Sequence, residues 1–456
     1  MNDTKTGHAA APSLDVVRRI FIVIGMLAIL VGVANVVVND WTSEATAGDP
    51  YDFGLNWVAA QRLVDSEPLY DRAASLADGL RLVGPSMLDT NHNPFSSFIG
   101  LPTTALLYAP FTVFDYETAG NMFRLTAVLA MFAAIGVATL ALPSASRLPA
   151  GLIGVGAALV STPFIESIFL GQVDGFLMLG LALAFVGVAH DRWGLVGFGI
   201  GIAALLKISP AILLVYLALR HKWRAVWFGL GTVAVLLVVA AAVGRFGDLF
   251  DWLDHVMAGV GDGARNTDNQ AIPAALARLW GGDDLKTQLP LGSWRILSYV
   301  IVAAGVAGLW WIRRHKPIEP LEFGVLVLVA LLAGPLSWDH YTVWSILVVV
   351  LIVDPRRWAG RRWAEIGVLA VALAGAMALM RIFTIMPEPG EVADQPLLRL
   401  TSSAKTAALL LLLAVALRLL LRPAPEEADD QGPTRLGILP RDAPAPYFLP
   451  DGPLRS

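Results

Sequence analysis

Long apolar segments recur along the whole chain and constrain its fold more than any other feature. The first, from Ile20 to Val38, follows Arg18 and Arg19 and contains about 19 residues, close to the roughly 20 that a helix needs to cross a bilayer. A cleaved signal peptide has a shorter apolar core and a small-residue cleavage site, so we predict that this segment is a retained membrane span. Further apolar segments lie at 119–142, 150–165, 171–189, 194–206, 210–219, 225–244, 293–312, 321–336, 342–353, 364–384 and 401–421. The chain is therefore predicted to be an all-α polytopic membrane protein with about 11 to 12 transmembrane helices.

The composition agrees with a membrane protein and excludes several functional classes. The hydrophobic fraction is 56% and the charged fraction 15%, against roughly 25% charged residues in soluble domains. The net charge of −4 and the lack of basic runs interleaved with aromatic residues argue against a nucleic-acid partner. The chain has no cysteine, and its seven histidines show no HExxH-like spacing. We therefore expect no disulfide, no thiolate nucleophile, no metal site and no cofactor.

Lysines and arginines in the short loops set the expected orientation, because such loops favour the cytoplasm. If every apolar segment crosses, the basic clusters fall on one side, namely Arg18/Arg19, Arg147, Arg192, Arg220/Lys222/Arg224, Arg313/Arg314/Lys316, Arg356/Arg357/Arg361/Arg362 and Arg418/Arg422. Both termini are then cytoplasmic, with a short N-terminal segment at 1–19 and a Pro- and Asp-rich tail at 422–456 that we expect to be disordered. The membrane domain spans 20–421. Its two long loops, about 40–117 and 245–292, are predicted to be external folded subdomains.

The segments 194–206 and 210–219 are too short to cross upright. They are joined at Lys207, Ile208, Ser209 and Pro210. We expect a short hairpin whose tip stops below the external surface, in protein or in a wet cavity, because lipid would leave its broken backbone without hydrogen bonds.

Polar clusters gather on the predicted external side. They are Asp49–Phe53 with Asn56 and Trp57, Pro68–Asp71, Asn91–Phe95, Gly171–Asp174, Lys207, Asn266–Gln270 and Ser337–Tyr341. Ionisable groups at membrane depth are costly and usually line a cavity or a substrate path. Their shared side favours one site facing away from the cytoplasm.

Each polar residue also has a purely structural interpretation. Asp52 could cap the following helix, and Lys207 could extend its ammonium to the membrane interface. Gln172 and Asp174 could link helices, His340 could be a satisfied histidine at a helix end, and 266–270 could form only a turn.

The order and spacing of these motifs resemble the polyprenol-phosphate-dependent glycosyltransferases of the C-type (GT-C) membrane superfamily, specifically glycosyltransferase family 87 of actinobacteria. The resemblance covers about residues 18–421 and is carried by Asp52-Phe53 with Trp57 and Ala59, Pro68-Leu69-Tyr70-Asp71, Gly171-Gln172-Val173-Asp174, Leu206-Lys207-Ile208-Ser209-Pro210, Asn269-Gln270 and Ser337-Trp338-Asp339-His340-Tyr341. The chain departs from the family at Asn93-Pro94-Phe95, where a Tyr-Pro-Pro stretch is frequent, and at Trp57, where a tyrosine is frequent. These departures leave the sugar and the acceptor open.

The resemblance implies a GT-C-like bundle and an inverting hexosyl- or pentosyltransferase on the external face of the plasma membrane. Such an enzyme moves a sugar, mannose ahead of arabinofuranose, from a polyprenyl-phosphate donor to an envelope glycolipid or polysaccharide. One carboxylate must accept the proton of the acceptor hydroxyl, and cations or hydrogen-bond donors must take up charge on the departing phosphate. By resemblance Asp52 is the general base. Lys207 is the expected phosphate ligand, with Arg124, Arg265 and Arg381 as helpers, and the expected substrate-binding residues are His340, Gln172, Asp174, Asn269, Gln270 and Trp57.

Two other functions compete with this interpretation. A transporter or flippase of lipid-linked sugars would also place polar groups at broken helices, but inverted repeats and midplane ion-binding residues are not evident in the sequence. A non-catalytic protein of envelope assembly would explain the topology but not the clustered aspartates, lysine and histidine.

Overall fold

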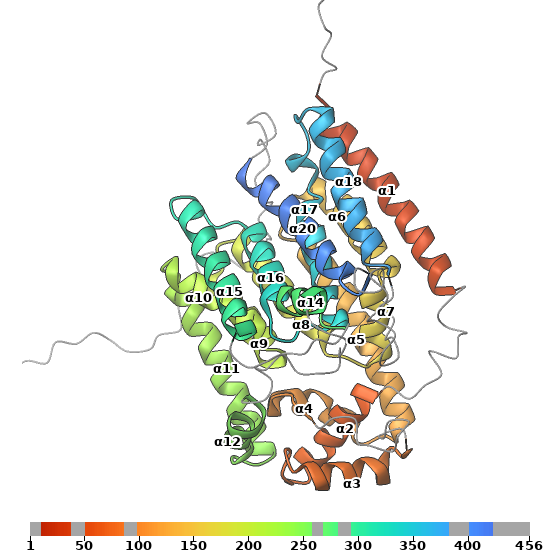
Figure 1. The fold of residues 1–456 in the computed structure, drawn as a ribbon, viewed down its shortest axis with the longest axis vertical. Helices are drawn as coiled ribbons and strands as arrows, with labels where there is room; N and C mark the ends of the chain where they lie inside the picture. The colour runs from red at the N-terminus through yellow and green to blue at the C-terminus, as the bar shows by residue number, and fades with distance from the viewer. Residues whose placement is uncertain are drawn as a thin grey trace, which may run out of the picture.

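The computed structural model describes residues 11–37, 51–85, 98–257, 268–280, 293–382 and 401–422. Within these ranges every regular element is helical, apart from one isolated bridge between Asn269 and Trp338 (Figure 1). The expectation of an all-α fold is thereby confirmed. The predicted tail at 422–456 lies outside the described residues, except for Arg422.

Each predicted apolar segment corresponds to a helix of the bundle. These helices are α1 (Leu14–Asn35), α5 (Tyr116–Thr139), α6 (Ser144–Val160), α8 (Asp174–Ala189), α9 (Trp193–Leu206), α10 (Ile212–Leu219), α11 (Trp223–Val243), α15 (Ser293–Arg313), α16 (Pro320–Ala333), α17 (Ser345–Ile352), α18 (Trp363–Leu379) and α20 (Ala404–Leu421). Among the described residues, five helices are long and apolar enough to cross a membrane alone, or six if one bent pair forms a single span. The others are shorter apolar helices packed among them. The protein is thus a multi-pass membrane protein.

The bent pair consists of α6 and α7 (Thr162–Phe169), whose axes differ by 66°. The sequence predicted one uninterrupted segment at 150–165. The break falls at Ser161, where the backbone is extended, and Pro163 occupies the first turn of α7. Proline has no N–H for the continuing helix and starts a new one readily. Because of this bend, α7 leaves the direction of α6 before the chain reaches α8.

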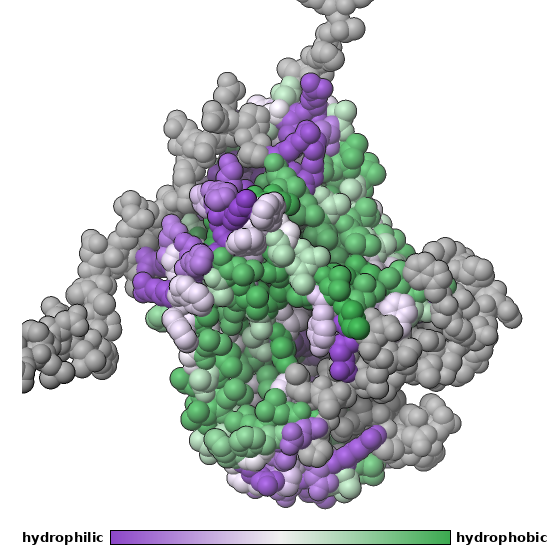
Figure 2. All heavy atoms as spheres, turned by 60° about the vertical axis from the view of Figure 1, so that its left-hand side comes forward, coloured by the Kyte–Doolittle hydropathy of each residue, from purple (hydrophilic) through white to green (hydrophobic). Residues whose placement is uncertain are grey.

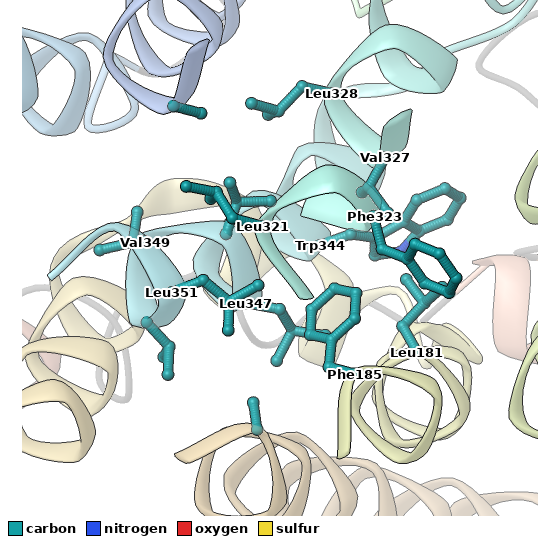
Figure 3. Packing of buried hydrophobic residues seen from close by; sticks show 14 of the residues in the cluster. Leu181, Phe185, Leu321, Phe323, Val327, Leu328, Trp344, Leu347, Val349 and Leu351 are labelled. Atoms are coloured by element: carbon teal, nitrogen blue, oxygen red, sulfur yellow. The ribbon is translucent and has the colours of Figure 1, made fainter. Parts of the chain in front are cut away.

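The centre of the bundle is built from helices that are apolar on all sides. Every residue of α16 from Leu321 to Ala333 is buried, as is every residue of α17. Figure 3 shows Leu321, Phe323 and Val327 of α16 packed with Leu347 of α17 and Phe185 of α8. A helix that is hydrophobic all round needs cover on every face. The surrounding helices provide that cover, so these two short helices are fixed in the interior.

The two ends of the bundle differ in composition. At one end, backbone and side-chain contacts join the basic loops: Gly360 N–H donates to Pro12 O at 3.1 Å, and Arg357 contacts Glu319 at 2.9 Å. Exposed tryptophans lie near this end, namely Trp223, Trp227, Trp311 and Trp363, as is typical of a membrane interface. Figure 2 shows a broad hydrophobic band between hydrophilic ends. The predicted basic clusters thus share one end of the molecule.

Short helices from both long loops occupy the opposite end (Figure 1). They are α2 (Tyr51–Val64), α3 (Arg72–Leu82), α4 (Pro102–Tyr108) with its 3-10 extension η4 (Ala109–Phe111), and α12 (Asp248–Asp251) followed by η6 (Trp252–Met257). The two loops are linked, because Leu69 N–H donates to Asp248 Oδ1 at 3.2 Å and Trp252 Nε1 donates to Ile99 O at 3.1 Å. The remaining elements are η5 (Ser209–Ala211), α14 (Ile272–Trp280), η7 (Asp339–Trp344) and η8 (Pro355–Arg357).

Candidate active site

Asp52 lies in the first turn of α2 and faces the membrane bundle. Its carboxylate Oδ2 accepts a hydrogen bond of 2.6 Å from Nε2 of Gln172, a residue 120 positions away in the sequence. This long-range bond shows that Asp52 does more than begin a helix. The pair joins the first long loop to the connection before α8. The roles predicted for Asp52 and Gln172 stay predictions.

Glycine at position 171 makes this pairing feasible. Its φ is +65°, a left-handed conformation that glycine adopts without cost. A Cβ at this position would lie 2.7 Å from Cβ of Phe53, which is closer than packing allows. The Tyr108 hydroxyl donates to Gly171 O at 2.7 Å and holds the turn from its other side. Gly171 therefore lets α2 approach closely enough for Asp52 to reach Gln172.

Asp174 is completely buried at the start of α8 and has three partners. Its Oδ1 accepts from Lys207 Nζ at 2.9 Å and from Trp344 Nε1 at 2.9 Å, and its Oδ2 accepts from Ser167 Oγ at 2.8 Å. These donors come from the hairpin tip, η7 and α7. The predicted proximity of Lys207 and Asp174 is thus present, and Asp174 joins four separate segments.

The Lys207 ammonium also lies over an aromatic face. It is 3.3 Å from the ring centroid of Tyr341, and Tyr341 stacks on Trp344 with centroids 5.3 Å apart. His340 packs edge-on against Tyr341, with a centroid distance of 4.8 Å. His340 Nε2 is buried and has no hydrogen-bond partner within the described ranges. A buried imidazole nitrogen without a partner is costly unless a ligand completes it.

The electrostatic environment of Asp52 suits proton transfer. Burial raises the pKa of its carboxyl above the ordinary 3.8, and the negative charge of Asp174 adds to that increase. The Gln172 hydrogen bond and the positive charge of Lys207 partly offset it by lowering the pKa. A carboxylate with a raised pKa is a stronger base than one in water.

Asn269 and Gln270 anchor the second long loop beside the site. Asn269 Nδ2 donates to Pro335 O at 2.9 Å, and its Oδ1 accepts from Ser337 N at 3.0 Å. Gln270 Nε2 donates to Ser402 O at 2.9 Å, while its Oε1 accepts from Thr406 N at 3.1 Å. Both side chains are fully buried. Of the two roles predicted for them, sugar binding and loop ordering, these contacts show the second.

Three charged residues near the site were not singled out from the sequence. Lys405 forms a buried ion pair with Asp339 between α20 and η7. Arg278 of α14 donates to Asn269 O at 2.7 Å and to Ser402 O at 3.2 Å. Glu166 of α7 interacts electrostatically with Asp339, Lys405, Asp268 and Asp52. The available signal was a charged residue inside an apolar segment, Lys405, and another directly after one, Glu166, since such positions are seldom charged without a function.

Other predicted site residues lie in different surroundings. Arg124 approaches Asn121 at 3.5 Å and Arg381 contacts Asn35 at 3.2 Å, while Arg265 lies outside the described residues. Trp57 is buried among aromatic side chains, and its Nε1 donates to Phe111 O at 3.3 Å. It therefore holds α2 in place, and direct contacts of these four residues with substrate stay predictions. In the part of the chain that the structure describes, no group of three or more potential metal ligands comes together.

The helical bundle and this polar cluster together define a multi-pass membrane protein with a candidate active site at one end of its spans. The model of glycosyltransferase family 87 matches residues 98–337, more than half of the chain. The chain belongs to this family and is a glycosyltransferase, as the motif pattern indicated.

Curated relatives come from two mycobacterial species. A polyprenol-phosphate-mannose-dependent alpha-(1-2)-phosphatidylinositol mannoside mannosyltransferase of Mycobacterium tuberculosis is 28% identical over 330 residues, covering 68% of this chain and 73% of the relative. A protein of the same description from Mycolicibacterium smegmatis is 26% identical over 371 residues, covering 75% and 78%. An alpha-(1-2)-phosphatidylinositol pentamannoside mannosyltransferase of M. tuberculosis is 25% identical over 332 residues, covering 70% and 73%.

Proposed function

We propose that this glycosyltransferase moves mannose from a polyprenyl-phosphate donor to a phosphatidylinositol mannoside or a related envelope glycolipid, on the external face of the membrane. The descriptions of the relatives support the donor and the acceptor class. The observation that carries the mechanism is the placement of Asp52 against Gln172, in the electrostatic range of Lys207 and Asp174.

The reaction is a direct displacement with inversion. Asp52 accepts the proton of the acceptor hydroxyl, and the hydroxyl oxygen forms a bond to the anomeric carbon of the donor sugar. The bond between that carbon and the phosphate oxygen breaks, and polyprenyl phosphate leaves with the electron pair. Lys207 and Nε2 of His340 face the departing phosphate and take up its charge.

The two carboxylates nearest Gln172 have different roles. Asp174 accepts three hydrogen bonds, one of them from the Lys207 ammonium, so both of its oxygens are occupied. Asp52 bonds to one neutral amide. Asp52 is therefore the carboxylate available to accept a proton, and Asp174 positions Lys207.

Lys207 can serve both Asp174 and the donor. An ammonium has three N–H donors, of which one points to Asp174. The side chain is 12% exposed at the tip of the hairpin. The ring face of Tyr341 covers one side of the ammonium, and its exposed part can donate to a phosphate oxygen that enters from the membrane side.

Replacement of Asp52 tests the mechanism. Asp52→Asn keeps the size of the side chain and its hydrogen bond to Gln172 after an amide flip, but it cannot accept a proton at neutral pH. Turnover of the purified protein with a synthetic polyprenyl-phosphate mannose should fall by about 10² to 10⁴-fold. The melting temperature should change little.

Two neighbouring aspartates are matched controls. Asp71 caps α3, with Oδ1 accepting from Ala74 N at 3.1 Å, and asparagine caps a helix equally well. Asp71→Asn and Asp49→Asn should therefore retain activity; Asp49 lies outside the described residues. Near-normal turnover of Asp52→Asn with loss in a control would assign the base to another carboxylate. Activity in all three variants would leave the mechanism without a base in this loop.

The acceptor is tested separately in cells. A strain lacking this chain should accumulate the glycolipid that is one mannose shorter than the product. If phosphatidylinositol mannosides are unchanged and a different envelope glycan is truncated, the proposed acceptor is wrong. The roles of Asp52 and Lys207 are tested independently by the assay with purified protein.

A further inference from the structure

A polar cavity lies at the opposite end of the bundle from Asp52. Its volume is about 330 Å³. Its walls come from connections that are far apart in sequence: the α5–α6 turn, the α8–α9 turn, Lys222 before α11, the α15–α16 loop and the α17–α18 loop. Anything bound in this cavity would contact several connections at once.

Three cations line the cavity together with three carboxylates, which are Asp191, Glu319 and Asp354, and the cations differ in their partners. Arg356 pairs with Asp354 and Arg357 pairs with Glu319, each at 2.9 Å. Lys222 lies 4.2 Å from the ring centroid of Trp193 and has no carboxylate within ion-pair distance among the described residues. Nε of Arg357 is buried without a hydrogen-bond partner in the same ranges. Lys222 and Arg357 therefore retain hydrogen-bond donors for an anion.

Asp191 and several apolar side chains complete the lining. Val188, Leu321 and Leu351 contribute hydrocarbon, and Trp193 closes one side. Exposed Trp223 follows Lys222 directly in the chain. Tryptophan and lysine side chains of this kind mark the boundary between hydrocarbon and head groups.

We infer that this cavity binds the phosphate head group of an anionic phospholipid in the adjacent leaflet. A phospholipid presents a phosphodiester beside glycerol and acyl carbons, which matches donors next to an apolar wall. Basic pockets between transmembrane helices bind such head groups, and arginine and lysine are their usual ligands. The lipid would tie together the helix connections that enclose the cavity.

The site is independent of sugar transfer, because it shares no residue with the cluster around Asp52. The test uses the full chain purified in mild detergent. Native mass spectrometry measures retention of phosphatidylglycerol and of phosphatidylcholine with the same acyl chains. Thermal unfolding with inorganic phosphate alone separates a lipid from a free anion.

The decisive variant is Lys222→Gln, which removes the cation that no carboxylate neutralises. Phosphatidylglycerol affinity should fall about tenfold, since a hydrogen bond to a charged group is lost. Lys222→Arg should restore it. Arg314→Gln is the matched control, because Arg314 is a half-buried cation that lies over Trp311 at the same end but outside the cavity lining. Sugar transfer by each variant shows that the protein is folded.

Three results would overturn the inference. Equal retention of phosphatidylglycerol by the wild type and Lys222→Gln would remove Lys222 from any lipid site. An equal loss in Arg314→Gln would indicate general attraction to a basic surface. Stabilisation by inorganic phosphate that matches stabilisation by phosphatidylglycerol would identify a free-anion site.

Discussion

The two ends of the bundle use buried carboxylates in different ways. At the basic end, Glu322 is fully buried and surrounded by donors: Arg220 at 2.9 Å, Arg313 at 3.1 Å, and the hydroxyl of Tyr216. At the other end, Asp52 bonds to the neutral amide of Gln172, and His340 Nε2 nearby has no hydrogen-bond partner among the described residues. The first carboxylate is satisfied by cations, whereas the second keeps capacity for a ligand.

This difference separates stabilisation from chemistry. A buried charge whose partners are all in place holds helices together, and removal of one partner leaves the others uncompensated. A buried group that lacks a partner is a cost, which a substrate can relieve. Asp174 with Lys207 lies between these extremes, because the ion pair is complete but the lysine is still partly exposed.

The largest expected effect concerns the side of the membrane on which each end lies. Reporter fusions at Gly263, in the second long loop, and at Arg357, beside the lipid cavity, should give opposite and all-or-none signals. We expect Gly263 outside and Arg357 in the cytoplasm, because the basic loops share one end. Signals from the same side at both positions would overturn the topology and the external active site with it.

The next effect tests the basic end. Glu322→Gln leaves the guanidinium groups of Arg220 and Arg313 without their shared carboxylate in a buried position. The free energy of unfolding should fall by about 3 to 5 kcal/mol, measured by thermal or denaturant unfolding in detergent. Turnover per folded molecule should be retained.

The control for Glu322 is Glu117→Gln, an exposed acid in the first turn of α5. It should alter stability by only a few tenths of a kcal/mol. A Glu322→Gln protein that unfolds like the wild type would show that this network adds nothing to stability. The contrast drawn between the two ends would then fail.

Much of the fold followed from the sequence because its strongest signal is hydrophobic length. The apolar segments became helices at nearly the expected positions, and Lys207 lies at the predicted break between two short ones. The motifs around Asp52, Gln172, Asp174, Lys207 and His340 were expected to meet, and they do.

Other features depended on contacts that hydropathy does not encode. The bend at Ser161 followed from Pro163, a signal present in the sequence but hidden inside an apolar run. Lys405 was not singled out from the sequence, and its partner Asp339 is 66 residues away. The contacts of Trp57 with Tyr116 and with Phe111 O could not be read from the sequence either. Side-chain pairing across such distances needs the structure.

The next prediction concerns Lys207, whose ion pair with Asp174 is complete but whose side chain is partly exposed. Lys207→Gln removes one charged donor, so the KM for the polyprenyl-phosphate donor should rise by about tenfold to a hundredfold. The KM for the acceptor serves as the internal control and should change little. The buried Asp174 loses its cation, so the melting temperature should fall, although its bonds to Ser167 and Trp344 remain. An unchanged donor KM with a lowered melting temperature would make Lys207 a structural partner of Asp174.

The smallest effect within the usual pH range concerns Asp52 and Gln172. Because the base must be ionised, turnover should rise with pH through the pKa of Asp52 and level off above it. Burial raises that pKa, so the acidic limb should lie above pH 3.8. The Gln172 hydrogen bond lowers the pKa, and Gln172→Leu should therefore move the limb further toward neutral pH.

The raised pKa also means that protonation of Asp52 favours the folded state, so the loss of activity on the acidic limb is not caused by unfolding through this group. The measurement is kcat against pH for both proteins, with circular dichroism at each pH. If the acidic limb of the pH profile lies at the same pH in Gln172→Leu as in the wild type, then the titrating base is not Asp52. This conclusion holds even if turnover at neutral pH has fallen.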